Sequence, residues 1–116
     1  MNDSSTPEFL QGIYEFEGTG LGNPVAIEAL TYTVPPGSRA QPVYFRGGNS
    51  CDDMIYVLLQ RDGAPMRYFP IGARGATHVS LRVVEDLLSD TILTVAVAAP
   101  EGVHGTVVID TGLMEI

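Results

Sequence analysis

The stretch Thr91-Ile-Leu-Thr-Val-Ala-Val-Ala-Ala99 carries the strongest strand signal in the sequence. It is rich in β-branched and small apolar residues, and the acidic residues Asp90 and Glu101 bound the apolar run. The run is about half as long as the ~20 residues that a helix needs to cross a bilayer. Its length and composition therefore predict a buried β-strand.

Working outward from this stretch, strand signals recur about every ten residues between Gly, Pro and Asp, as in sandwiches and barrels. Residues Met54–Gln60 are apolar on both faces, which predicts a central strand. Residues His78–Val83 alternate, with His78 on the solvent face, and Asp62-Gly63 predicts a hairpin turn. The fold class that follows is all-β, a two-sheet antiparallel β-sandwich of jelly-roll type with about eight strands.

The length of 116 residues fits one domain. We expect residues 1–11 to be a disordered lead-in and residues 12–116 to form the sandwich. The polar, acidic start Met1–Glu8 lacks the basic and apolar segments of a secretory signal. Cys51 is the single cysteine, so it cannot form an internal disulfide. These features predict a cytoplasmic protein.

The chain is acidic, with a net charge of −8 and a pI near 4.4. This charge argues against nucleic acid and anionic membranes as partners, because both bind basic surfaces. All six cationic side chains are arginines between Arg39 and Arg82, a segment that holds three of the fourteen acids. Either the charges mix on the folded surface, or opposite faces attract each other between subunits of a homo-oligomer.

Four residues in this arginine-bearing segment are candidates for ligand binding: Arg39, Tyr44, Arg46 and Asn49. Arginine and tyrosine dominate binding hot spots, and both hydrogen-bond or stack with planar polar groups. Packing of the tyrosine into the sandwich would explain its presence equally well.

Three acids are candidates for a metal site. Glu15 and Glu17 lie on the first predicted strand and Asp110 on the last. In many jelly rolls these strands are neighbours, and calcium takes several carboxylate and carbonyl oxygens. A structural calcium is therefore one interpretation, and no other cofactor is expected. The alternative is that these acids are solvated and discourage pairing between sheet edges.

No catalytic constellation is recognisable. Cys51 lies beside Asp52 and Asp53, whose negative charge opposes formation of a thiolate nucleophile. His78 and His104 show no zinc-site spacing and no signature that joins them to Cys51. A chemical role for these three residues stays open, but the sequence favours a non-enzymatic protein.

Four segments carry a resemblance to a known family: Tyr14–Gly18, Tyr32–Gly37, Val57–Gly63 and Val108–Asp110 with Leu113–Ile116. They resemble the first strand, a valine-proline turn, the central strand and the last strand of galactose-binding-like jelly rolls, carbohydrate-binding modules in particular. The resemblance implies a jelly-roll sandwich. It also implies a calcium site with Glu17 on the first strand and Asp110 on the last.

Three functions follow as hypotheses. The first is a non-catalytic interaction or assembly module that self-associates or binds a protein partner. The second is a calcium-stabilised carbohydrate-binding domain that uses Tyr44, Arg46 and Asn49 for its ligand. The third is a small enzyme whose site is not visible in the sequence.

Overall fold

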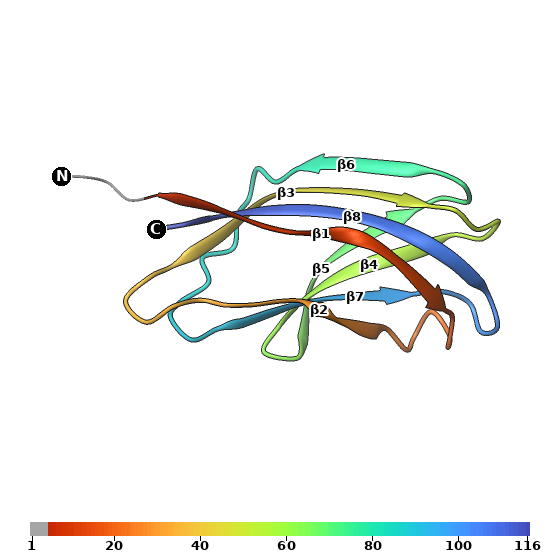
Figure 1. Ribbon diagram of the computed structural model, residues 1–116, viewed down its shortest axis with the longest axis horizontal. Helices are drawn as coiled ribbons and strands as arrows, with labels where there is room; N and C mark the ends of the chain where they lie inside the picture. The colour runs from red at the N-terminus through yellow and green to blue at the C-terminus, as the bar shows by residue number, and fades with distance from the viewer. Residues whose placement is uncertain (1–4) are drawn as a thin grey trace.

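The computed structural model describes residues 5–116 and confirms the two-sheet antiparallel sandwich with eight strands (Figure 1). The strands are β1 (Thr6–Glu17), β2 (Val25–Thr33), β3 (Ala40–Asn49), β4 (Ile55–Arg61), β5 (Ala64–Ile71), β6 (Ala76–Ser80), β7 (Ile92–Ala98) and β8 (His104–Glu115). Sheet A has the order β1-β8-β3-β6, and sheet B has the order β2-β7-β4-β5. Within residues 5–116 no helix is long and apolar enough to cross a membrane.

The core lies between the two sheets and explains the strongest sequence signals. Strands β7 and β4 are the two central strands of sheet B. Val57 and Leu59 on β4 belong to this core, and Leu58 on the opposite face of the strand is also fully buried, as the apolar pattern of Met54–Gln60 predicted. Phe45 of sheet A stacks on Phe69 of sheet B, with ring centroids 4.3 Å apart. This aromatic pair joins the two layers.

The predicted turn at Asp62-Gly63 connects β4 to β5. Both residues have positive φ, 51° and 83°, as a two-residue hairpin of type I′ requires. Aspartate tolerates this conformation and glycine adopts it without steric cost.

The first and last strands are neighbours, as the sequence analysis predicted for a jelly roll. Strands β1 and β8 pair antiparallel from Thr6 opposite Glu115 to Glu17 opposite His104. The expectation of a disordered lead-in over residues 1–11 differs from this arrangement, because residues 6–11 form the first half of β1. Leu10 is buried there and anchors the segment. Pro7 is compatible with pairing because β1 is an edge strand. Residues 1–4 lie outside the described residues.

Candidate ligand-binding site

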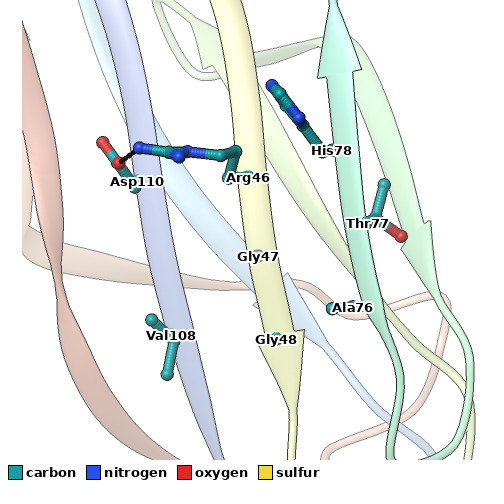
Figure 2. Close-up of a pocket in the computed structure, with 8 residues that line it drawn as sticks. All are labelled: Arg46, Gly47, Gly48, Ala76, Thr77, His78, Val108 and Asp110. Carbon is teal, nitrogen blue, oxygen red and sulfur yellow. Dashed lines mark hydrogen bonds and ion pairs between the residues drawn. The ribbon is translucent and has the colours of Figure 1, made fainter.

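The outer face of sheet A holds a shallow hollow of about 480 Å³ (Figure 2). It lies over strands β3, β6 and β8, where alternate residues point away from the core. The lining residues are Arg46, Gly47, Gly48, Ala76, Thr77, His78, Val108 and Asp110. We refer to this set as the hollow.

Gly48 opens the hollow. In the sheet register Gly48 lies between Val108 on β8 and Ala76 on β6. A Cβ atom on Gly48 would have Val108 Cβ, at 3.9 Å, as its one neighbour within 4 Å. The space above the glycine is therefore open, and its floor is apolar.

A polar group borders this floor. Arg46 Nη2 donates to Asp110 Oδ2 at 2.6 Å, and the Tyr44 hydroxyl donates to Asp110 Oδ1 at 2.7 Å. The Arg46 guanidinium also lies 5.4 Å from the centre of the Tyr44 ring. Figure 2 shows the Arg46 side chain reaching from β3 to β8, with His78 on the opposite side of β3. Planar hydrogen-bonding groups thus line one side of the hollow.

The pKa values of both Tyr44 and Arg46 are raised in this group. Burial, followed by the hydrogen bond to Asp110, raises the pKa of the Tyr44 hydroxyl, which stays protonated. The hydrogen bond to Asp110 is also the main reason that the pKa of Arg46 is raised. Each Asp110 oxygen retains a second acceptor position, and the more exposed Arg46 retains further donors. Asp110 and Arg46 can therefore hydrogen-bond a ligand without losing their own contact.

The predicted metal residues do not converge. Asp110 lies opposite Gln11 on β1, whereas Glu15 lies opposite Thr106 and Glu17 opposite His104. Four positions along a strand separate Asp110 from the level of Glu15, a distance of about 13 Å. Within residues 5–116 no three His, Cys, Asp or Glu side chains form a group suited to a metal ion. Structural calcium stays a prediction.

Glu15 and Glu17 instead line a second hollow, of about 490 Å³, at the open edge between β1 and β2. Its other lining residues are largely apolar: Tyr14, Phe16, Thr19, Val25, Ala26, Ile27 and Val97. Glu15 and Glu17 thus lie toward the β1 edge of the molecule, four or more positions along the strands from the level of Asp110.

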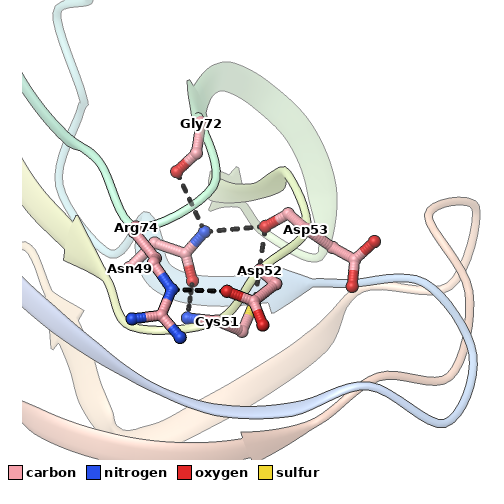
Figure 3. A network of polar contacts seen from close by, with 6 residues as sticks. All are labelled: Asn49, Cys51, Asp52, Asp53, Gly72 and Arg74. Atoms are coloured by element: carbon pink, nitrogen blue, oxygen red, sulfur yellow. Dashed lines mark hydrogen bonds and ion pairs between the residues drawn. The ribbon is translucent and has the colours of Figure 1, made fainter.

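The four predicted ligand residues do not all lie at the hollow. Arg39 pairs with Asp86 at 3.2 Å and does not line the hollow. Asn49 is 6% exposed, and its Nδ2 donates to the backbone oxygens of Asp53 and Gly72 at 2.9 and 3.1 Å. Its Oδ1 accepts from the Cys51 amide (Figure 3). Asn49 therefore holds the β3–β4 and β5–β6 loops together, next to an exposed ion pair between Arg74 and Asp52.

Of the four predicted ligand residues, Tyr44 and Arg46 lie together, and they meet Asp110 from the predicted metal set. Sequence reasoning missed Gly48, Ala76 and Val108, and it treated His78 as an ordinary surface residue. The available signal was the Gly47-Gly48 pair inside a strand, since glycine there often marks a close approach to another group.

The chain is thus a jelly-roll sandwich with an open hollow on one sheet face. No family model and no curated protein sequence matches the chain. Among solved structures it is similar to the CBM36-1 domain of a multidomain xylanase from the hindgut metagenome of Trinervitermes trinervoides. The TM-score is 0.61 at 19% identity, with 94% of this chain and 96% of that chain covered. The chain therefore has the fold of a carbohydrate-binding module, as the resemblance in its sequence predicted.

A second solved structure, an exo-beta-1,3-galactanase from Phanerochaete chrysosporium with galactose, matches with a TM-score of 0.35 at 14% identity. The match covers 92% of this chain and 29% of that chain. A similarity at this level supports no argument.

Proposed function

We propose that the protein is a carbohydrate-binding domain whose ligand binds in the hollow on sheet A. The observation that carries the proposal is an open apolar floor beside the planar polar side chains of Arg46, Asp110 and His78. A sugar ring has apolar C–H faces and a rim of hydroxyl groups, and this lining offers a partner to each.

The chemistry of the hollow supports binding rather than cleavage. Glycoside hydrolysis commonly uses two carboxyl groups that flank the scissile bond. Asp110 is the one carboxylate among the lining residues, and it is held by Arg46 and Tyr44. A few hydrogen bonds on an open surface predict a dissociation constant between about 10 µM and 1 mM.

This proposal takes up the second sequence hypothesis. The similarity to a solved carbohydrate-binding module favours it over the self-associating or protein-binding module. The ligand residues differ from those first expected, because Asn49 and Arg39 are engaged elsewhere.

The test is retention of the purified protein on xylan, cellulose, mannan and galactan, followed by calorimetry with oligosaccharides of each polysaccharide that binds. We expect Arg46→Ala to weaken binding at least about tenfold, because it removes donors of charge-assisted hydrogen bonds. Arg39→Ala is the matched control, since the two arginine side chains are similarly exposed, 53% and 56%. Running each assay with calcium and with a chelator also tests the calcium prediction.

Two results would overturn the proposal. One is no retention on any polysaccharide. The other is equal affinity in the two arginine variants, which would place the ligand away from the hollow.

A further inference from the structure

An apolar row crosses the outer face of sheet A and extends beyond the hollow. The sheet register aligns Ile13 with Val108, Val108 with Gly48, and Gly48 with Ala76. Ile13 and Val108 are 71% and 47% exposed, although both are large and apolar. The row therefore runs through β1, β8, β3 and β6, and its β1 end lies outside the hollow. We call these four residues the apolar row.

Polar groups flank the apolar row on both sides. On one side the register aligns Gln11, Asp110, Arg46 and His78 into a polar row over the same four strands. On the other side the register aligns Glu15 with Thr106. The Ser50 hydroxyl lies next to Thr106 and accepts a hydrogen bond from its backbone amide. Neighbouring rows on one face are about 6.6 Å apart, and four strands span about 14 Å. Figure 2 shows Val108, Gly48 and Ala76 in one line, with Asp110, Arg46 and His78 in the next.

The pattern is a strip with an apolar centre and two hydrogen-bonding borders, open at both ends. A linear sugar chain has the same cross-section, with C–H groups on its ring faces and hydroxyls along both edges. A pocket for one terminal sugar would be closed on at least one side, whereas the residues of this strip lie on the outer face of four paired strands of one sheet.

The charges on the strip favour a neutral ligand. Arg46 and Asp110 neutralise each other at 2.6 Å, so the polar row presents hydrogen-bonding groups without a net charge from this pair. Glu15 and the net charge of −8 repel polyanions such as polyuronates.

We propose that the apolar row is a track for several consecutive units of an uncharged, linear polysaccharide, which lies along the row and so crosses the four strands. This inference rests on the proposed function. Ile13 then contacts a sugar that the hollow itself does not reach. The ligand class is an internal chain segment rather than a single sugar or a chain end.

The test is calorimetry with uncharged oligosaccharides of one to six units prepared from xylan, cellulose and mannan. We expect affinity to rise at least about tenfold from the monosaccharide to the tetrasaccharide. Ile13→Ala should weaken binding of the hexasaccharide about three- to tenfold and leave the disaccharide unaffected, because it removes apolar contact at one end of the track. Val83→Ala is the matched control, since Val83 is 73% exposed and lies outside the row. Affinity should change little with salt, as expected for an uncharged ligand.

The outcomes separate this inference from the function on which it rests. If Arg46→Ala weakens binding but chain length and Ile13→Ala have no effect, the site binds sugar and the track is wrong. Tighter binding of polygalacturonate than of the neutral series would overturn the neutral ligand class. If no sugar binds at all, the proposed function itself fails.

Discussion

Replacing Gly48 with valine should raise the stability of the protein and lower its affinity for sugar. The prediction distinguishes the effect of Gly48 on stability from its effect on sugar binding, because most substitutions in a binding site reduce both stability and affinity. Gly48 lies inside β3, has no positive φ, and would place its Cβ 3.9 Å from Val108 Cβ. This distance is an ordinary van der Waals contact, so a Cβ atom at position 48 fits without moving the backbone.

The stability gain has two sources. Glycine inside a strand costs about 0.5–1 kcal/mol relative to alanine, because it loses more backbone freedom on folding. Valine opposite Val108 adds a cross-strand apolar pair worth about 0.2–1 kcal/mol. We expect the free energy of unfolding to rise by about 1 kcal/mol, which raises the melting temperature by about 3–6 °C in a domain of this size.

The loss of affinity comes from the space that valine occupies. Its methyl groups stand where the floor of the hollow is now open, and they lift a sugar away from Arg46 and Asp110. Loss of two hydrogen bonds at about 1 kcal/mol each weakens binding roughly thirtyfold. Thermal unfolding and calorimetry on the same preparation measure both changes.

Gly22→Val is the control, because Gly22 has open space around it, no positive φ, and a place outside the hollow. It should bind sugar like the wild type. A Gly48→Val protein that melts higher and binds unchanged would show that the hollow is not the site. One that melts lower would contradict the geometry on which the reasoning depends.

Three further predictions concern stability. Phe45→Ala should lower the free energy of unfolding, measured by urea denaturation, by about 3–5 kcal/mol, because it removes a fully buried ring that stacks on Phe69. A loss below about 1 kcal/mol would contradict the inference that this aromatic pair joins the two sheets. Asn49→Ala should cost about 1–3 kcal/mol in the same assay, because it leaves loop carbonyls without their donor, and an unchanged denaturation midpoint would argue against it. Burial and the hydrogen bond to Glu115 raise the pKa of the Tyr32 hydroxyl above its ordinary value of 10.0. The protonated hydroxyl therefore stabilises the fold below about pH 10, and this stabilisation is lost as the pH rises through the folded-state pKa. Wild type should therefore lose up to about 1.4 kcal/mol per pH unit more than Tyr32→Phe above about pH 10, and parallel pH profiles would refute this.

The fold was largely predictable because strand periodicity and turn chemistry are local. Residues 54–60 and the Asp62-Gly63 turn depend on near neighbours in the chain, and the structure confirms both. The start of β1 was not predictable in the same way. Its pairing depends on β8, about a hundred residues away, and Pro7 reads locally as a strand breaker.

The site was only partly predictable because it depends on register. Residue types pointed to Tyr44 and Arg46, and the adjacency of β1 and β8 was expected. Nothing local shows that Asp110 lies opposite Arg46 rather than beside Glu15, since one step in register moves every side chain to the other face. Asn49 illustrates the same limit, because one of its partners, Gly72, lies on the β5–β6 loop more than twenty residues away.

The pairing of β1 with β8 also determines how the domain would respond to tension. Thr6 and Glu115 form the pair at one end of the sheet, where β1 begins and β8 ends (Figure 1). A force that separates the two ends acts on this pair first and then on each next pair in turn, so the strands unzip rather than slide past each other. Unzipping breaks the hydrogen bonds of this ladder a few at a time, which requires less force than shearing all of them together. The domain should therefore be mechanically weak when pulled by its ends, even where its thermal stability is high.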